Sequence, residues 1–419
     1  MNPLTQALAS RIESLAPELR AIYEDLHRHP ELSMQEQRTA GIAAGWIERC
    51  GFEVRRGVGV TGVVGVMRNG DGPTVLLRGD MDALPMDEDT GLPYASRVAG
   101  VAHSCGHDLH VAWLMGAARV LAEARECWRG TLLVVFQPGE ETAEGARAML
   151  ADWEAAGLLR ADVVLGQHVM VGAAGTVSCR AGVVLSAGES LQVRLFGRGA
   201  HGSQPQNAVD PVLMAASTVL RLQGIVAREI DPQQGAVLTV GALQAGTKEN
   251  IIPEEAILKL NMRSYDEGVR EHMLDAVRRI CCAEAQASAA PKEPEFTTLS
   301  SFPLTENDPA ATARVAAAFR AQFGDAALEG RPAAASEDFS IFGRSWGVPY
   351  VFWFVGGTDP EVHARAVRDG TLRDIPANHS PRFAPVLEPT PRTGLEAMLS
   401  AASAWLCADV DDATAGERA

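Results

Sequence analysis

The chain has 419 residues, of which 47% are hydrophobic and 21% are charged. This length predicts at least two domains, and the composition is typical of a soluble globular protein. The formal net charge of −16 argues against nucleic acid and against anionic membrane surfaces as partners. A small anionic substrate is still compatible with this charge, because a local cluster of arginines can override the overall field.

The N-terminal segment and the cysteines indicate the compartment. Residues 1–28 are amphipathic and carry several acids, so they do not resemble a secretory signal. No uninterrupted apolar run approaches the roughly 20 residues that a membrane-spanning helix needs. The seven cysteines are an odd number, and Cys281 and Cys282 are adjacent. This pattern fits a reducing compartment better than a disulfide framework, so we expect a cytoplasmic protein without a membrane partner.

The first eighty residues predict two helices and three strands. Leucines and isoleucines at spacings of three and four predict a helix over residues 4–28, which Pro30 ends. A second helix is expected over residues 36–50, followed by strands at 52–56, 61–67 and 74–78. His27 and His29 lie at the end of the first helix, where we expect them to cap it rather than to bind a ligand.

Two aspartates follow the third of these strands, in Gly-Asp-Met-Asp-Ala-Leu-Pro at residues 79–85. A spacing of two places Asp80 and Asp82 on one side of an extended segment. The end of a buried strand is where open α/β sheets usually carry their active sites. Two turn-forming aspartates would explain the pattern equally well.

The segment from His103 to His110 concentrates three of the ten histidines of the chain. Only Gly106 separates Cys105 from His107, and glycine tolerates the turn that would aim both side chains at one point. Thiolate and imidazole together favour zinc, cobalt, nickel or manganese over magnesium or calcium. His103 and His110 are expected to support this site as neighbours, unless they are simply polar groups beside it. The alternative is a chance cluster at the start of a helix over residues 109–125.

Two more buried strands end in side chains that bind metals. The apolar run 130–136 leads to Glu140 and Glu141, and uncompensated carboxylates at such a position are costly. One glutamate is therefore expected to ligate a metal and the other to act on a nearby water, unless both are the first acids of a helix over 142–149. The apolar run 162–168 ends in His168, and His379 lies in a turn before a helix at 388–407.

The middle of the chain has a different pattern. Residues 186–196 alternate between polar and apolar, which predicts a half-exposed strand. A helix (209–222), strands (236–243 and 257–263), a helix (267–285) and a strand (295–299) follow, in the order of a small open-faced sandwich. We therefore expect an inserted domain at 184–296 between two parts of one domain, 1–183 and 297–419. The second part resumes with a helix at 308–323 and a strand at 350–357, and the chain ends in a polar tail after Asp409.

These motifs together resemble the aminoacylase/carboxypeptidase G superfamily of metallopeptidases, and within it the hippurate hydrolase and indole-acetyl-amino-acid hydrolase branch. The resemblance covers almost the whole chain and rests on seven motifs in the same order. They are GDMDALP, HSCGHDLH, FQPGEE, GQHV, GRGAHGSQP, ENIIP and NHSPRF. The fold class that it implies is α/β, with a mixed central sheet, helices on both faces as in di-metal exopeptidases, and an inserted ferredoxin-like lid or dimerisation domain. A homodimer or higher homo-oligomer through that domain is also implied.

The resemblance also implies two divalent metal ions per subunit, either zinc, manganese, cobalt or nickel. Cys105 matches the position that bridges the two metals, where other branches have an aspartate. The remaining ligand positions are matched by His107, Glu141, His168 and His379. Asp80 falls where those branches carry a ligand histidine, so we leave it outside the ligand set. After His168 the chain lacks the proline-containing segment that is usual in the family, which leaves the shape of the pocket open there.

The implied reaction is hydrolysis of an N-acyl amino acid to a carboxylic acid and an amino acid. Glu140 matches the general base, and Asp82 matches the acid that orients a ligand. His201 and Asn250 match lid residues that meet the substrate, in several relatives across a dimer interface. His201 would donate to the oxyanion as the lid closes. Further candidates for substrate contact are Arg263, which with Asn250 would hold the substrate carboxylate, and Gly356, which would line the pocket.

Two other functions are compatible with parts of the sequence. Cys105 could be a thiolate nucleophile with a histidine partner. A non-catalytic small-molecule binding protein could use the same scaffold, although such a protein would tolerate a broken ligand set and this chain retains every ligand position. The sequence alone does not identify the acyl group, the amino acid or the physiological metal.

Overall fold

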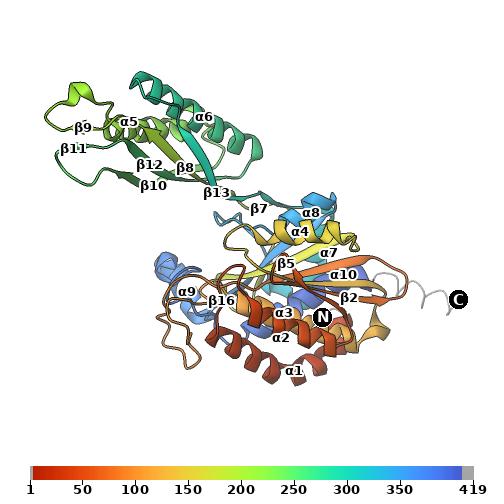
Figure 1. Cartoon of the computed structure of the whole chain (residues 1–419). Helices are drawn as coiled ribbons and strands as arrows, with labels where there is room; N and C mark the ends of the chain where they lie inside the picture. The colour runs from red at the N-terminus through yellow and green to blue at the C-terminus, as the bar shows by residue number, and fades with distance from the viewer. Residues whose placement is uncertain (1–2, 408–419) are drawn as a thin grey trace. The chain divides into compact units, whose positions relative to one another are not determined.

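The computed structural model describes residues 3–407, so the polar tail after Asp409 lies outside the described residues. The described chain forms two compact units (Figure 1). The first unit comprises residues 3–184, 306–331 and 338–407, and the second comprises residues 185–305 and 332–337. The boundary predicted at residue 296 falls inside strand β13 (Glu295–Phe302), which pairs within the second unit and therefore extends that unit past the prediction.

The first unit is built on an eight-stranded sheet with the order β1-β2-β4-β3-β5-β16-β6-β15. β4, β3, β5 and β16 are parallel neighbours, whereas β1, β2 and β6 introduce antiparallel pairs. The strands are β1 (Glu53–Val58), β2 (Gly62–Asn69), β3 (Thr74–Asp80), β4 (Gly130–Gln137), β5 (Val163–Ala173), β6 (Val177–Cys179), β15 (Ala327–Glu329) and β16 (Tyr350–Thr358). β3 is buried along its whole length, as its continuous apolar run predicts.

Helices cover both faces of this sheet. Figure 1 shows α1, α2 and α3 on one face and α4 and α8 on the other. The helices of the first unit are α1 (Pro3–Arg28), α2 (Gln37–Arg49), α3 (His107–Glu123), α4 (Gly145–Ala155), α7 (Pro309–Phe323), α8 (Ser340–Trp346), α9 (Pro360–Asp369) and α10 (Thr390–Leu406). The mixed sheet with helices on both faces confirms the predicted fold class. Among residues 3–407, no helix combines the length and the apolar character that crossing a bilayer requires.

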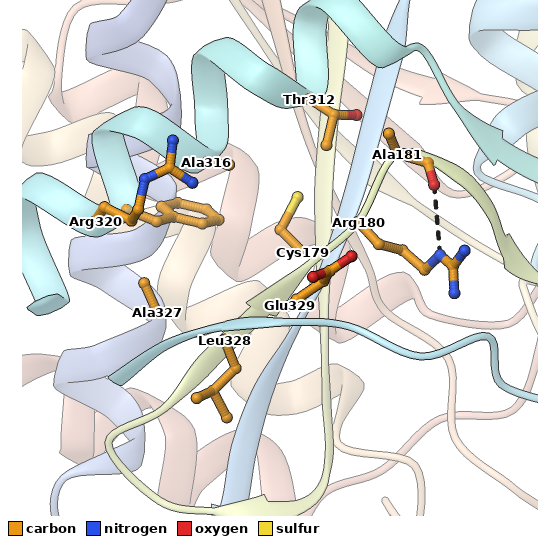
Figure 2. Close-up of a pocket in the computed structure, with 10 residues that line it drawn as sticks. Cys179, Arg180, Ala181, Thr312, Ala316, Arg320, Ala327, Leu328 and Glu329 are labelled. Carbon is orange, nitrogen blue, oxygen red and sulfur yellow. Dashed lines mark hydrogen bonds between the residues drawn. The ribbon is translucent and has the colours of Figure 1, made fainter. Parts of the chain in front are cut away.

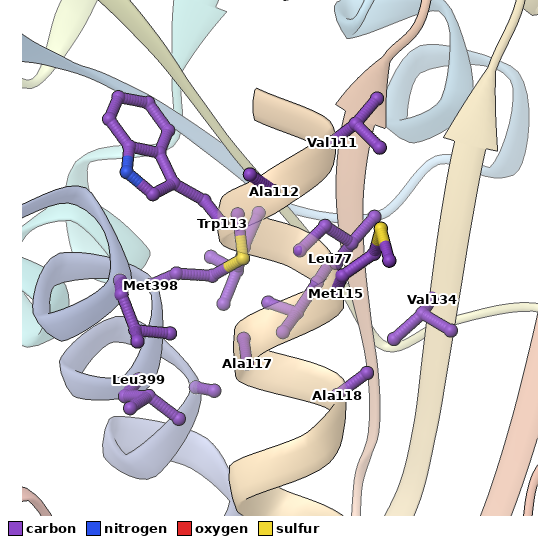
Figure 3. Packing of buried hydrophobic residues seen from close by; sticks show 14 of the residues in the cluster. Leu77, Val111, Ala112, Trp113, Met115, Ala117, Ala118, Val134, Met398 and Leu399 are labelled. Atoms are coloured by element: carbon purple, nitrogen blue, oxygen red, sulfur yellow. The ribbon is translucent and has the colours of Figure 1, made fainter. Parts of the chain in front are cut away.

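α3 is the centre of the hydrophobic core of the first unit. It lies between the sheet and α10, and Figure 3 shows Leu77 of β3 and Met398 of α10 packed near Trp113 and Met115. Gly394 allows α10 to approach closely, because a Cβ atom there would lie 2.0 Å from the Trp113 ring. The helix that begins at His107 is therefore fixed on two sides by packing.

Several predicted boundaries are wrong for identifiable reasons. The helix expected over 142–149 begins only at Gly145, so Glu140 and Glu141 lie in a turn before it and are not its first acids. β5 continues past His168 to Ala173 because it pairs with β16 as far as Thr358. α8 and α9 were not predicted at all, since both are short and lack a long apolar repeat.

The second unit is a four-stranded antiparallel sheet with two helices. Its elements follow one another as β8 (Ala187–Phe196), α5 (Pro211–Gly224), β10 (Ala236–Ala245), β12 (Glu255–Ser264), α6 (Glu267–Ala287) and β13. The sheet order is β10-β12-β8-β13, which is the ferredoxin-like arrangement. Asp210 and Asp266 cap the two helices by accepting hydrogen bonds from their first turns.

Shorter elements complete the chain. β9 (Ala200–His201) pairs with β11 (Ile251–Ile252) in the second unit. β7 (Gly182–Leu185) and β14 (Thr305–Asn307) lie where the chain passes from one unit to the other.

Shortening Leu77 tests this account of the core. The Leu77 side chain is fully buried in β3, so we expect Leu77→Ala to lower the free energy of unfolding by about 2 to 5 kcal/mol. Leu328→Ala is the matched control, because Leu328 is 47% exposed on β15 and should change stability by less than about 0.5 kcal/mol. Urea unfolding measures both; equal losses would contradict the packing described.

Candidate metal centre

Parallel pairing brings the ends of the central strands to one edge of the sheet. Asp80 at the end of β3 lies in register with Gln137 at the end of β4. His168 on β5 lies in register with Phe354 on β16. The loops that leave these strands therefore begin side by side, and they carry Asp82 and Glu140.

The five predicted ligands gather at this edge. Cys105, His107 and His168 form one group whose ligand atoms lie within 4.8 Å of one another, and Cys105, Glu141 and His379 form a second. The Cys105 Sγ atom is 3.4 Å from His168 Nε2, and His379 Nε2 is 3.3 Å from Glu141 Oε2. His107 Nε2 and Glu141 Oε1, which are 3.9 Å apart, connect the two groups. Cys105 belongs to both groups.

Asp82 and Glu140 flank these ligands. Asp82 Oδ1 is 3.1 Å from His107 Nδ1, so the carboxylate accepts a hydrogen bond from Nδ1–H and Nε2 is the ring nitrogen that faces the other candidate ligands. Asp82 Oδ2 accepts hydrogen bonds from Ser33 and from the Glu141 backbone N–H, which fixes the carboxylate. Glu140 is buried, and its Oε2 atom is 3.9 Å from His107 Nε2.

His168 and His110 are held in single tautomers. His168 Nδ1 donates to the Val169 carbonyl at 2.7 Å, which leaves Nε2 free to face Cys105. His110 Nε2 accepts the Val169 backbone N–H at 3.0 Å, so the proton of this ring is on Nδ1, 2.5 Å from Asp80 Oδ1. Burial lowers the pKa of His110, which agrees with this neutral form.

Asp80 is a structural acid at the base of the site. The Arg78 guanidinium is fully buried and donates to Asp80 at 2.5 Å, to Gln137 at 2.9 Å and to Asp338 at 3.2 Å. Burial opposes ionisation of Asp80, but Arg78 and the neighbouring histidines outweigh it and hold the pKa of Asp80 well below its usual range. Its Oδ2 atom is 3.7 Å from His107 Nε2. Asp80 thus accepts hydrogen bonds from His110 and Arg78, while Asp82 accepts one from His107.

Comparisons with known proteins decide the family of this chain. The model of peptidase family M20/M25/M40 matches residues 76–374. Hippurate hydrolase of Campylobacter jejuni is 37% identical over 82% of this chain and 90% of its own, and N-acetyl-L-cysteine deacetylase of Bacillus subtilis is 34% identical over 82% of each. The chain belongs to the M20 family. A dinuclear metal-binding M20 peptidase from Bacillus subtilis covers 93% of this chain and 98% of its own, with a TM-score of 0.73 and 27% identity.

The donor set of this M20 hydrolase fits metal ions. His107 Nε2 and Glu141 Oε1 are buried and have no hydrogen-bond partner in the described structure, although unpaired buried polar atoms are costly. A cation that accepts both lone pairs would remove that cost. One sulfur, three imidazoles and one carboxylate are the ligand types of zinc and its neighbours in the periodic table.

Three of the remaining predicted site residues belong to the second unit. His201, Asn250 and Arg263 belong to the second unit, where His201 Nδ1 accepts the Ser203 backbone N–H at 3.1 Å. Gly202 donates its backbone N–H to the Asn250 carbonyl at 2.8 Å. The Arg263 guanidinium is half-buried and donates to Asn261 at 3.1 Å within the second unit.

Gly356 is on β16 in the first unit. A Cβ atom there would lie 2.1 Å from the Ala173 carbonyl oxygen, so close approach of two strands accounts for this glycine. Its contact with a substrate stays a prediction.

Two histidines differ from what the sequence predicted. His27 does not cap α1: it is buried, with Nδ1 2.6 Å from Asp108 Oδ2 and Nε2 3.3 Å from Glu88 Oε1. Burial opposes its charge, but the two carboxylates raise the pKa of His27 to about 10. His103 is also buried, has no hydrogen-bond partner for either ring nitrogen among the described residues, and has a pKa lowered to about 4 by burial. It therefore does not support the ligands through a hydrogen bond, contrary to expectation.

Glu36 is a third residue that sequence reasoning missed. It is fully buried, and its Oε1 atom accepts the Gly139 backbone N–H at 2.9 Å while Oε2 accepts the Thr61 hydroxyl at 2.5 Å. It thereby fixes the turn that precedes Glu140. The only signal in the sequence is an acid at a helix start, which is too common to identify this contact.

Another cavity in the first unit does not contain these residues. This cavity has a volume of about 220 Å³. Cys179, Arg180, Arg320 and Glu329 are among the residues that line it (Figure 2). Burial raises the pKa of the Cys179 thiol to about 12, so this thiol stays protonated and unreactive. None of the residues that line this cavity belongs to a candidate metal-binding group of the described residues.

Metal binding by this M20 hydrolase should depend on pH. Hydrogen bonds to Cys105 and Glu141 raise the pKa of His379 to about 10 in the metal-free protein. At neutral pH the ring is thus protonated, and a metal must displace that proton, so affinity should rise with pH and binding should release protons. Zinc titration calorimetry in two buffers with different ionisation enthalpies measures the release. A proton release of zero across about pH 6 to 9 would contradict the arrangement.

Proposed function

We propose that the chain hydrolyses the amide bond of N-acyl amino acids, giving a carboxylic acid and a free amino acid. The observation that carries the proposal is the pair of ligand groups that share Cys105, with the buried Glu140 beside them. The relatives named hippurate hydrolase and N-acetyl-L-cysteine deacetylase support an N-acyl amino acid as the substrate class.

Five residues would hold two divalent cations. Cys105 would bridge them, and the other ligands would be His107, Glu141, His168 and His379. When bound, the two cations supply a water of lowered pKa and a positive charge that polarises the scissile carbonyl. Zinc, manganese, cobalt and nickel all suit this ligand set.

The two adjacent glutamates would divide the work. Glu140 takes a proton from the attacking water and passes it to the leaving amine, because a carboxylate is a general base that becomes a general acid once it is protonated. Glu141 is committed as a ligand and cannot do this. Asp82 keeps the His107 ring oriented through the hydrogen bond to Nδ1.

The second unit would supply the substrate contacts. Because His201 Nδ1 accepts a backbone N–H, the ring proton is on Nε2, where it can be donated to the developing oxyanion. We assign Asn250 and Arg263 to the substrate carboxylate and Gly356 to the pocket wall. In this scheme the first unit is catalytic, and the second unit is a lid that also forms a homodimer or higher oligomer. The seven cysteines, all unpaired, support a reducing cytoplasm.

A cysteine nucleophile is the competing reaction. Cys105 Sγ is 3.4 Å from His168 Nε2, which resembles a thiolate–imidazole pair. However, His168 is buried and its pKa is lowered well below its usual range, first by burial and then by His110, so it is a poor partner for an ion pair. A binding protein without activity is the third candidate, and the complete ligand set argues against it.

Replacing the general base gives the sharpest test. We expect Glu140→Gln to retain both metals and to lower kcat by several orders of magnitude, because the amide cannot accept the proton. Glu144→Gln is the matched control, since Glu144 is exposed at the start of α4 and should leave kcat within about twofold. Metal analysis and hydrolysis of benzoyl-glycine measure the two effects. Activity of Glu140→Gln near that of the native chain would remove Glu140 from the mechanism.

Chelation separates the metal reaction from the thiol reaction. We expect a chelator to abolish hydrolysis and a divalent metal to restore it, because the ligands remain in place when the cations leave. A thiol hydrolase would keep its activity in the chelator and lose it to a thiol-alkylating reagent. Binding of acyl amino acids without hydrolysis by the metal-loaded protein would favour the non-catalytic function.

The acyl group is to be found by a substrate panel. Acetyl, benzoyl, indole-acetyl and long-chain acyl amino acids would be compared on manganese-loaded and zinc-loaded protein, and the ratio of kcat/KM values would define the preference.

A further inference from the structure

The side chain of Asn378 joins two backbone segments that carry metal-binding residues. Its Nδ2 atom donates to the Cys105 carbonyl oxygen at 3.0 Å and to the Val169 carbonyl oxygen at 3.0 Å. Cys105 is itself a candidate ligand, and Val169 follows His168. Because both partners are carbonyl oxygens, only the NH₂ end of the amide can face them, and both of its hydrogens are used.

The Val169 carbonyl couples this amide to the His168 ring. The same oxygen accepts the His168 Nδ1–H at 2.7 Å, so Asn378 and the imidazole meet on one acceptor. The position of this oxygen determines how the His168 ring is turned, and therefore where Nε2 points. The backbone N–H of the same residue, Val169, donates a hydrogen bond to His110 Nε2. Val169 is thus fixed at both of its backbone polar groups.

Asn378 also directly precedes the candidate ligand His379 in the sequence. His379 has a φ of 68°, which is the left-handed region that few residues other than glycine adopt. Its backbone N–H donates to the Ser104 carbonyl at 2.8 Å, next to the carbonyl that Asn378 holds. The uncommon conformation of His379 is therefore maintained by two consecutive anchors onto the Cys105 segment.

We propose that Asn378 is a positioning residue of the metal centre, whose amide sets the relative placement of Cys105, His168 and His379. The inference rests on the proposed function, since it concerns how this chain prepares its ligands for the two cations. One side chain ties the segment before the inserted unit to the segment after it. Asn378 does not touch the substrate in this account; it acts through the three ligands.

Three substitutions separate the hydrogen bonds from the bulk of the side chain. Asn378→Asp keeps the shape but removes both N–H donors and places a negative charge against two carbonyl oxygens. Asn378→Ala removes the donors without adding a charge. Asn378→Gln retains the donors on a longer side chain and should recover part of the native behaviour.

Asn307 provides a matched control within the same unit. It is a buried asparagine whose Nδ2 atom also donates to two backbone carbonyls, those of Arg180 at 2.9 Å and Phe352 at 2.8 Å. It belongs to none of the metal-binding groups. Asn307→Asp therefore removes the same kind of bridge and should lower the melting temperature without changing metal binding.

Cobalt binding by the full chain is the measurement. Competition with a chelator of known affinity gives the cobalt dissociation constant, and the thiolate-to-cobalt charge-transfer absorption reports on Cys105. We expect Asn378→Asp and Asn378→Ala to weaken cobalt binding by about 10- to 100-fold and to alter that absorption. In the loaded enzyme kcat should fall while KM changes by less than about threefold, because substrate contacts are intact. Asn307→Asp should match the native chain in both cobalt measurements.

Three outcomes would overturn the positioning role. Native affinity and absorption in Asn378→Asp would do so, and so would equal losses of affinity in the Asn378 and Asn307 variants, which would indicate general destabilisation. If Asn378→Asp does not fold, Asn378→Ala is judged by the same criteria. A native chain that binds no cobalt would refute the proposed function as well. The native chain binding two cobalt ions while Asn378→Asp is unchanged would refute the positioning role alone.

Discussion

The buried guanidinium of Arg78 connects the chain segments that carry the candidate metal centre. Arg78 reaches the acid at the end of its own strand, the glutamine at the end of β4 and Asp338 at the start of α8. From Asp80 the chain of contacts continues through His110 to the backbone of Val169. Breaking a buried ion pair by removing one partner typically costs about 3 to 5 kcal/mol, because the other charge is left without compensation. These contacts join the strand ends to one another. The candidate ligands that follow the strands therefore begin from fixed positions.

Side chains of the same type have different roles here because they have different partners. Asp80 and Asp82 are two residues apart, yet one faces a guanidinium and a neutral imidazole, and the other faces a ligand histidine. His27 and His103 are equally buried, but the carboxylates beside His27 raise its pKa, while burial is the largest cause of the lowered pKa of His103. Residue type and spacing restrict what a site can do, and the partners that packing supplies decide what each residue does.

Much of the fold and of the ligand set could be predicted from the sequence. Apolar runs that precede Asp80, Glu140 and His168 predicted buried strands, and parallel strands deliver their carboxyl ends to one edge. The contacts of Glu36, His27 and Asn378 could not be found in this way. Each joins segments tens to hundreds of residues apart, and each uses a residue type that is common in helix caps and turns. Local periodicity contains no information about such partners.

The order of the ligands along the chain has a consequence for biosynthesis. Four of the five candidate ligands precede the second unit, whereas His379 follows it and the short return segment 332–337. During translation the first four side chains are made long before the last one, so an N-terminal fragment presents an incomplete set of ligands. In this order, the candidate ligand set would be complete only after almost the entire polypeptide has been synthesised and its two flanking parts have come together. A chain that stops early would lack the imidazole of His379.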